Sequence, residues 1–183
     1  MKIRISTGEL RGRFITVPDE HNDFRPTKDM VRQAVLNSLG TRVRGAVCAD
    51  ICSGSGAIGF ELLSRGAASV EFVESNIALV RVIHDHARRF TLEDRVEVRN
   101  TAARIFVGNC VKKFDIICFD PPYSDAALAE LVGPICNIIA DDGILVYERE
   151  SKRGAVFNPP EGFAADCRTY GKTEIVYLTK SEA

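Results

Sequence analysis

An acidic residue and three glycines share one short stretch, residues 47–59 (Val-Cys-Ala-Asp-Ile-Cys-Ser-Gly-Ser-Gly-Ala-Ile-Gly). An apolar run contains Asp50, a helical pattern follows the stretch, and its glycines are Gly54, Gly56 and Gly59. Because glycine has no Cβ, such a loop brings backbone N–H groups close to a ligand at the start of a helix. Glu74 lies about 20 residues further on, where a carboxylate can bind a ribose. The spacing therefore predicts a site for a ligand that contains a nucleoside.

Glu74 ends the apolar run Val-Glu-Phe-Val-Glu and has two interpretations. It can accept hydrogen bonds from both ribose hydroxyls, or it can cap the helix that follows at Ser75-Asn76. Asp50 narrows the choice of ligand, because its carboxylate would repel the pyrophosphate of NAD and attract a cation. S-adenosylmethionine carries a sulfonium and an α-ammonium and no phosphate. The charge of Asp50 therefore favours S-adenosylmethionine as the cofactor.

A second motif, Asp120-Pro121-Pro122-Tyr123, follows the apolar run 114–119. Two consecutive prolines lack N–H donors and restrict the backbone, so carbonyl oxygens here can point rigidly into a pocket. A carboxylate and a fixed carbonyl that accept both N–H bonds of an exocyclic amine would direct its lone pair toward an incoming methyl group. Tyr123 can stack on an extruded base. The alternative interpretation is a proline-rich turn after a strand.

From residue 46 onward, strand-like and helical patterns alternate. Apolar runs predict strands at 46–51, 69–74, 95–99, 114–119 and 142–148, and helical patterns lie at 57–65, 76–90, 102–107 and 125–139. This alternation predicts a parallel sheet covered by helices on both faces. Two further strands, 163–169 and 173–179, are too close for a helix between them and should form an antiparallel hairpin. A seven-stranded, mostly parallel α/β sheet with this C-terminal hairpin is similar to the Rossmann-like class I methyltransferase fold.

The N-terminal residues form an extension of different character. Residues 2–17 predict a β-hairpin, and 27–39 predict a helix that ends at Gly40. Residues 1–45 hold nine Lys/Arg and five Asp/Glu, a net charge of +4, whereas the remainder holds fifteen and twenty, a net −5. The excess of positive charge indicates either a surface for a polyanion or an ordinary solvated face. We expect two parts, an extension at 1–45 and a catalytic domain at 46–183.

The composition excludes several classes of protein. With 45% hydrophobic and 27% charged residues and no apolar run of about 20 residues, the chain is expected to be cytoplasmic, without a membrane anchor. The six cysteines form no C-x-x-C pair and the three histidines have no partners at metal-site spacing, so we expect reduced thiols and no metal.

Asp-Pro-Pro-Tyr after the fourth strand resembles the methyltransferases that modify exocyclic amino groups of nucleic acids. Nearly the whole chain resembles the bacterial family that methylates N2 of a guanine in 16S ribosomal RNA. The matching stretches are Ile3-Arg4-Ile5, Arg11-Gly12-Arg13, Arg25–Arg32, Asp50–Gly56, Leu63–Ala67, Asp120–Tyr123 and Val146-Tyr147-Glu148. Two places depart from that family's pattern: Ser6-Thr7-Gly8 replaces paired glycines, and the turn at 100–102 lacks the common acidic or second amide residue.

The resemblance implies a role for each group of residues. The cofactor would be held by Asp50, Ser53, Gly54, Ser55, Gly56, Glu74, Ser75, Asn100, Thr101 and Ala102. The base would be held by Asp120, Pro121, Pro122 and Tyr123. The RNA would be contacted by Arg11, Arg13, Arg25, Lys28 and Arg32. The expected partner is the 16S RNA of the small ribosomal subunit or of an assembly intermediate, met by a monomer.

Four other functions remain open at this point. The same tetrapeptide serves DNA adenine-N6 methylation, although the chain offers no separate domain for recognising a DNA sequence. Methylation of a protein glutamine usually goes with Asn in place of Asp120. An NAD-dependent dehydrogenase would explain the glycines but not the tetrapeptide. A non-catalytic ribosome assembly factor would not need Asp120 and Tyr123.

Overall fold

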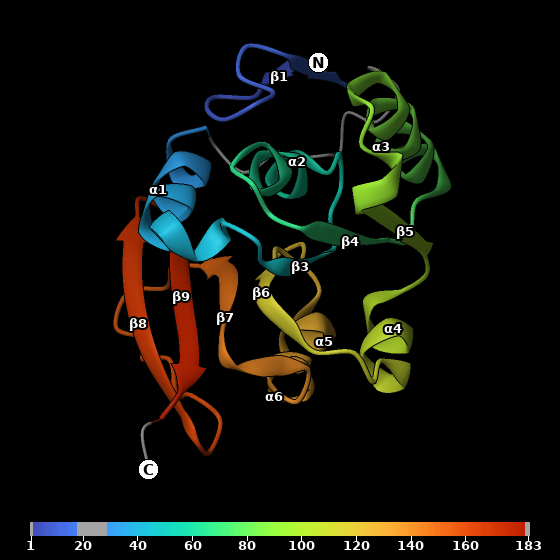
Figure 1. The fold of residues 1–183 in the computed structure, drawn as a ribbon. Helices are drawn as coiled ribbons and strands as arrows, with labels where there is room; N and C mark the ends of the chain where they lie inside the picture. The colour runs from blue at the N-terminus through green and yellow to red at the C-terminus, as the bar shows by residue number, and fades with distance from the viewer. Residues whose placement is uncertain (1, 18–28, 182–183) are drawn as a thin grey trace.

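The computed structural model describes residues 2–17 and 29–181. Seven strands form one sheet in the order β5-β4-β3-β6-β7-β9-β8 (Figure 1). In chain order they are β3 (Val47–Ile51), β4 (Ser69–Glu74), β5 (Val96–Asn100), β6 (Phe114–Phe119), β7 (Ile139–Glu150), β8 (Phe163–Tyr170) and β9 (Thr173–Lys180). Among the strands that the structure describes, β9 alone runs antiparallel to both of its neighbours. The strand order and the single reversed strand confirm the predicted class I fold.

Helices cover both faces of the sheet (Figure 1). They are α1 (Asp29–Leu39), α2 (Ala57–Ser64), α3 (Ile77–Phe90), α4 (Ala103–Asn109), α5 (Ala126–Ala129) and α6 (Val132–Cys136), with short 3₁₀ helices η2 (Gly40–Val43) and η3 (Glu93–Arg95). One buried cluster joins α1, α2 and α3 to one sheet face, and a second joins α4 and α6 to the other face. None of the described helices has the length and apolar character needed to cross a membrane.

The helix predicted at 125–139 is wrong. The structure has two short helices there, α5 and α6, and β7 begins at Ile139 rather than at residue 142. Pro134 explains the break, because it has no N–H to donate to the carbonyl four residues earlier and so prevents one continuous helix. The sequence carried this signal as Gly133-Pro134.

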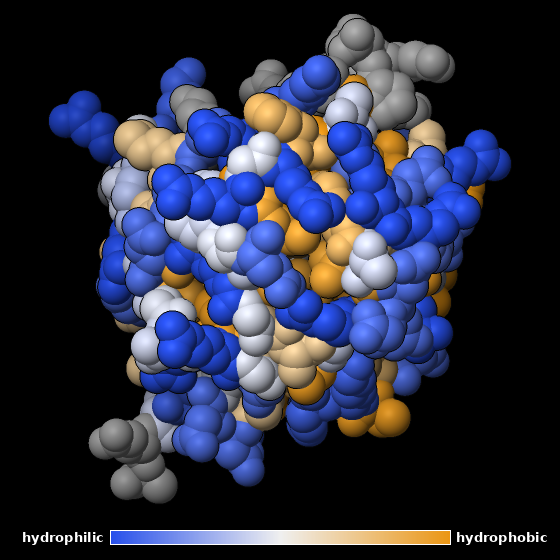
Figure 2. All heavy atoms as spheres, turned by 45° about the horizontal axis from the view of Figure 1, so that its top comes forward, coloured by the Kyte–Doolittle hydropathy of each residue, from blue (hydrophilic) through white to orange (hydrophobic). Residues whose placement is uncertain are grey.

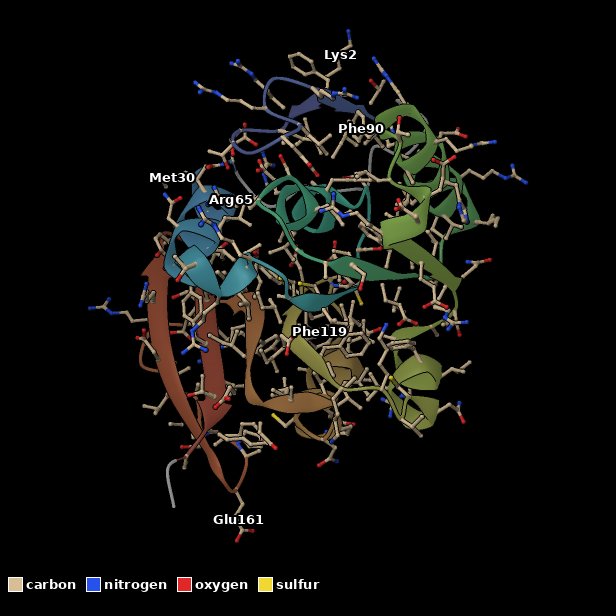
Figure 3. The ribbon with its side chains drawn as sticks, viewed as in Figure 1. Lys2, Met30, Arg65, Phe90, Phe119 and Glu161 are labelled. Atoms are coloured by element: carbon tan, nitrogen blue, oxygen red, sulfur yellow. The ribbon has the colours of Figure 1, made fainter. Side chains whose placement is uncertain are left out.

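The predicted N-terminal hairpin is confirmed. Strands β1 (Lys2–Arg4) and β2 (Phe14–Thr16) pair antiparallel and lie over the ends of α2 and α3 (Figure 1). The buried imidazole of His86 on α3 accepts the Thr16 N–H on Nε2 at 3.0 Å. The Arg13 guanidinium lies 5.5 Å from the centre of the Phe90 ring, which Figure 3 shows between the hairpin and α3. Polar and cation–π contacts therefore hold the hairpin against α3.

The unusual Ser6-Thr7-Gly8 turn is held against α2. Ser6 donates from both its N–H and its hydroxyl to Oε1 of the buried Glu61, at 2.9 and 2.8 Å. Gly8 has φ +78°, and a Cβ there would lie 1.7 Å from the Ser64 carbonyl oxygen. Only glycine allows this approach, so the structure retains the glycine that the close contact requires and uses the Ser6 hydroxyl to bind α2.

Candidate active site

Acidic side chains follow three neighbouring parallel strands at their carboxyl ends. Asp50 on β3 lies opposite Phe72 on β4 and opposite Cys118 on β6. Glu74 and Asp120 follow Phe72 and Cys118 by two residues, and residues two apart on a strand point to the same face. The three carboxylates therefore gather at one edge of the sheet, on the face covered by α1, α2 and α3. This is where ligands bind in open α/β sheets.

The glycine loop between β3 and α2 is shaped by two residues with positive φ, Gly54 at 55° and Gly56 at 76°. Ser53 anchors the start of the loop by donating its N–H to the Val73 carbonyl at 3.1 Å. A Cβ on Gly59 would lie 2.2 Å from the Phe72 ring, so this glycine brings α2 close to the sheet. The first two glycines shape the loop backbone, and the third permits the helix–strand packing.

The Glu74 carboxylate accepts N–H groups at the start of α3 and in the glycine loop, and its role toward a ribose stays a prediction. Its Oε2 accepts the Gly54 N–H and its Oε1 accepts the Asn76 N–H, each at 2.8 Å. Asn76 in turn caps α3 through its own side chain, which accepts the Ala78 N–H. A carboxylate has about four acceptor sites, so these two bonds orient the group and still allow it to accept ribose hydroxyls. The Glu74 carboxylate is thus fixed before any ligand arrives.

Asp50 is a buried carboxyl group that suits a cationic ligand. It is 3% exposed, and its Oδ2 accepts the Gly59 N–H at 3.0 Å. Burial, reinforced by the negative charges of Asp120 and Glu74, raises the pKa of Asp50 to about 8. Within the described residues no arginine or lysine forms an ion pair with it. A bound cation would offset the cost of the buried negative charge.

The Ser55 hydroxyl gives a second indication of a ligand. Its side chain is fully buried in the glycine loop, and its Oγ has no hydrogen-bond partner among the described residues. A buried hydroxyl without a partner is unusual in a folded protein. Together with Asp50 and Glu74, it offers a cationic amino acid group and a ribose the polar partners that they require. The residues present therefore fit S-adenosylmethionine, the cofactor of methyltransferases with this fold.

The turn after β5 lies beside Glu74, as the sequence predicts. Asn100 donates from its side-chain amide to the carbonyls of Glu74 and Ser75, both at 3.0 Å. The Thr101 N–H also donates to the Glu74 carbonyl, at 3.2 Å. Ala102 is exposed at the start of α4. Because its side-chain N–H groups are bonded to the main chain, Asn100 stabilises the turn.

The Asp120–Tyr123 motif begins where β6 leaves the sheet. The Asp120 N–H donates to the Ile51 carbonyl of β3 at 3.4 Å, which prolongs the strand ladder into the motif. Pro121 is buried, and the Pro122 carbonyl accepts the Asp125 N–H at 3.0 Å. Since the Pro122 carbonyl closes the turn into α5, the fixed acceptor expected beside the Asp120 carboxylate is the carbonyl of Asp120 or Pro121.

Tyr123 is anchored by residues that the sequence analysis did not assign. Its hydroxyl donates to Glu148 Oε1 on β7 at 2.8 Å and lies 3.0 Å from the Thr173 hydroxyl on β9. The side chain as a whole is 44% exposed. Burial of the hydroxyl and the nearby carboxylates of Glu148 and Asp120 raise the pKa of Tyr123, so the hydroxyl stays protonated and donates. The ring is thus fixed at one end and open to solvent elsewhere.

Cys52 is a second feature that the sequence analysis missed. It follows β3 with φ 61°, a left-handed conformation that is uncommon for residues other than glycine. Burial raises the pKa of its thiol to about 12, and the charges of Glu74, Asp120 and Asp50 act in the same direction. The strained backbone turns the chain from β3 into the glycine loop. No local sequence signal distinguishes this cysteine.

The residues predicted to contact RNA fall into three groups. Arg11 and Arg13 are exposed on the N-terminal hairpin, and Arg25 and Lys28 lie outside the described residues. Arg32 is placed differently from the prediction, because its side chain is only 2% exposed. Its guanidinium lies 2.9 Å from an Asp29 oxygen and 3.7 Å from Glu61, and it donates to the Arg4 carbonyl.

The prediction for Arg32 is therefore corrected: its guanidinium joins α1 to α2 and the hairpin, and it is not a phosphate contact. Its acidic partners are Asp29 on α1 and Glu61 on a different helix. The spacing of Arg32 along its own helix gives no indication of Glu61.

Comparisons with known proteins agree with this geometry. Residues 3–179 match the family described as conserved hypothetical protein 95. The chain is 33% identical over 147 residues to ribosomal RNA small subunit methyltransferase D of Escherichia coli K12, which covers 80% of this chain and 71% of the relative. The protein of the same name in Haemophilus influenzae is 27% identical over 157 residues, covering 83% and 81%.

Among solved structures, yhhF of Escherichia coli, named as a candidate methyltransferase, covers both chains completely with a TM-score of 0.88 and 28% identity. The match thus extends over the N-terminal hairpin, the glycine loop and the reversed C-terminal strand. The chain belongs to the conserved hypothetical protein 95 family and is a class I S-adenosylmethionine-dependent methyltransferase.

Proposed function

We propose that this enzyme transfers a methyl group from S-adenosylmethionine to the exocyclic N2 of a guanine in the 16S RNA of the small ribosomal subunit. The observation that carries the proposal is the common edge of the sheet. There, the cation-attracting Asp50 and the ribose-binding Glu74 lie beside Asp120 and the anchored Tyr123 ring. Ribosomal RNA small subunit methyltransferase D, the relative named above, supports the choice of RNA.

The protein groups divide the work of the reaction. When bound, S-adenosylmethionine supplies an electrophilic methyl group on its sulfonium. The Asp120 carboxylate and the fixed carbonyl of Asp120 or Pro121 accept the two N2–H bonds, which directs the nitrogen lone pair away from the ring. On gaining the methyl group, N2 would release one proton to the Asp120 carboxylate. Asp120 is partly exposed, so it can pass that proton to water.

The target guanine must be extruded from its stack in the RNA to reach Asp120 at the carboxyl edge of the sheet. The ring of Tyr123 offers a stacking surface, because its hydroxyl is held by Glu148 and Thr173 while 44% of the side chain remains exposed. Stacking on an aromatic ring contributes about 1–3 kcal/mol per base. This would offset part of the cost of extruding the nucleotide.

The N-terminal extension, residues 1–45, is the proposed RNA-facing part. Figure 2 looks onto the side that carries the hairpin, and most of the surface seen there is hydrophilic. Lys2, Arg4, Arg11 and Arg13 are exposed on it, and Arg25 and Lys28 follow in the sequence. Cations of this kind bind phosphates without regard to sequence, so they would position the RNA and leave the choice of base to the site. The protein is expected to act as a cytoplasmic monomer.

The test is transfer of labelled methyl from S-adenosylmethionine to small subunits that lack the modification, with free 16S RNA and DNA measured in parallel. Nucleoside analysis should place the label in N2-methylguanosine. Label in N6-methyladenine on DNA would support the assignment of the site residues but contradict guanine in RNA as the substrate. Cofactor binding without any transfer would instead indicate a non-catalytic assembly factor.

A further inference from the structure

Glu148 lies next to Asp120 at the carboxyl edge of the sheet. The register pairs Cys118 on β6 with Val146 on β7, and the next pair is Phe119 with Tyr147. Glu148 lies on β7, and Asp120 directly follows β6 and continues its ladder through the N–H bond to the Ile51 carbonyl. Because they come two residues after Val146 and Cys118, we expect both side chains to project to the face covered by α1 and α2. Neighbouring strands lie about 4.8 Å apart, and the charges of both carboxylates raise the pKa of Tyr123, so Asp120 and Glu148 lie near the same hydroxyl.

The site therefore has two pairs of carboxylates. On the cofactor side, Asp50 on β3 is flanked by Glu74 on β4, and on the base side Asp120, which directly follows β6, is flanked by Glu148 on β7. Glu148 is 9% exposed. Its Oε1 accepts the Tyr123 hydroxyl at 2.8 Å, which fixes the orientation of the carboxylate plane. A carboxylate has about four acceptor sites, so the bond to Tyr123 does not by itself prevent Glu148 from accepting an N–H group of a ligand.

Guanine presents two donors beside one another on its Watson–Crick edge, N1–H and the N2 amino group. Adenine presents an N1 lone pair beside its N6 amino group. With the N2 amino group on Asp120, the guanine N1–H points to the neighbouring strand, where Glu148 lies. With adenine in the same place, the N1 lone pair would face that carboxylate and would be repelled.

We propose that the Glu148 carboxylate accepts the guanine N1–H and thereby selects guanine over adenine. The proposal rests on the function proposed above and names the residue that determines base specificity. A simpler role is that Glu148 only anchors Tyr123. The two roles differ in one respect: an anchor affects every base that stacks on Tyr123 equally, whereas an acceptor of N1–H discriminates between bases that differ at N1.

The test uses 2-aminopurine, which has the amino group of guanine on C2 but a lone pair at N1. Small subunits are reconstituted with either guanine or 2-aminopurine at the position that the wild-type enzyme methylates, and kcat/KM is measured for each. The wild type should prefer guanine by about tenfold or more, the effect of one hydrogen bond to a charged group. Glu148→Gln should reduce this ratio to near one, since an amide can donate to the lone pair at N1.

Three controls complete the experiment. Tyr123→Phe removes the hydrogen bond that orients Glu148 but keeps the carboxylate, so it should lower both kcat/KM values and reduce the guanine preference less than Glu148→Gln does. Glu97→Gln removes a carboxylate that is 49% exposed on the distant strand β5 and should leave the ratio unchanged. Unchanged calorimetric affinity of Glu148→Gln for S-adenosylmethionine would show that the variant is folded.

A Glu148→Gln enzyme that loses activity on both substrates equally, with the guanine preference intact, would overturn the inference and leave Glu148 as an anchor. A wild type that prefers guanine by less than twofold would overturn it too. If the wild-type enzyme forms no N2-methylguanosine at all, the proposed function fails, and the inference fails with it. If the wild type forms N2-methylguanosine but Glu148→Gln keeps the wild-type preference for guanine over 2-aminopurine, only the inference fails and the proposed function stands.

Discussion

The carboxylates of Asp50 on β3 and Glu74 on β4 accept main-chain N–H groups, whereas Glu148 on β7 accepts a side-chain hydroxyl. Asp50 and Glu74 are fixed by the N–H groups of Gly59, Gly54 and Asn76, which lie in the segments that follow the two strands. On the other side, Glu148 holds the Tyr123 hydroxyl across 25 residues of sequence, with Thr173 from a third strand. The cofactor half is therefore oriented by main-chain N–H groups, whereas Glu148 in the base half is oriented by a side chain.

This difference indicates how the enzyme can keep one half constant and vary the other. A backbone N–H is present whatever the side chain, so the cofactor half depends on a few glycines and two acidic residues. The base half depends on the identity of side chains on three strands, and changes there alter the substrate without disturbing the cofactor. The predictions below test whether the two halves can be separated in this way.

The largest expected effect is on transfer when Asp120 is replaced. Asp120→Ala removes the acceptor that directs the N2 lone pair, so the single-turnover rate should fall about a hundredfold to a thousandfold. The measurement is transfer of labelled methyl at saturating S-adenosylmethionine and RNA. A rate within threefold of the wild type would show that Asp120 does not take part in methyl transfer.

The cofactor half should be sensitive to packing. Gly59→Ala would place a Cβ 2.2 Å from the Phe72 ring, so the free energy of unfolding should fall by about 1–3 kcal/mol. Chemical denaturation measures this loss. Gly108→Ala on α4 is the matched control, because a Cβ there meets nothing within 4 Å, and its stability should be unchanged or slightly increased. Equal stability of the two variants would contradict the close packing of α2.

Loss of the Glu74 carboxylate should weaken cofactor binding. Glu74→Ala removes the expected ribose acceptor and leaves the N–H groups of Gly54 and Asn76 without their partner, a loss of about 1–3 kcal/mol in binding free energy. Calorimetric titration with S-adenosylmethionine measures it. An affinity equal to that of the wild type would leave Glu74 as a helix-capping residue only.

The smallest expected effect concerns pH. Because the pKa of Asp50 is raised to about 8, its carboxyl group holds a proton at pH 7 in the free protein, and a cationic ligand requires the ionised form. The affinity for S-adenosylmethionine should therefore rise by about tenfold between pH 7 and pH 9 and level off above the pKa. Asp50→Asn should bind weakly and lack this rise. If the wild type and Asp50→Asn showed the same pH dependence, the titrating group would belong to the ligand and not to Asp50.

The same contrast explains how much of the molecule could be predicted from its sequence. The strands, the glycine loop and the C-terminal hairpin were predictable, because their signals lie within a few residues. The Asp120–Tyr123 motif was also recognised locally. The anchoring of Tyr123 by Glu148 and Thr173 was not, since it depends on which strands become neighbours in the sheet.

Arg32 shows the same limit outside the site. The family resemblance implied an RNA contact, but Glu61 on α2 becomes a neighbour of Arg32 only when the two helices pack. The broken helix at 125–139 is a different case, because Gly133-Pro134 was a local signal that the helical periodicity of the apolar residues obscured.

The most direct test of two separable halves is calorimetric titration of Asp120→Ala with S-adenosylmethionine, performed beside the wild type. If Asp120 serves the base half alone, the variant that has lost transfer should bind the cofactor within about threefold of the wild-type affinity, far less than the loss expected for Glu74→Ala. A loss of affinity as large as that of Glu74→Ala would place Asp120 in the cofactor half and contradict the division of the site.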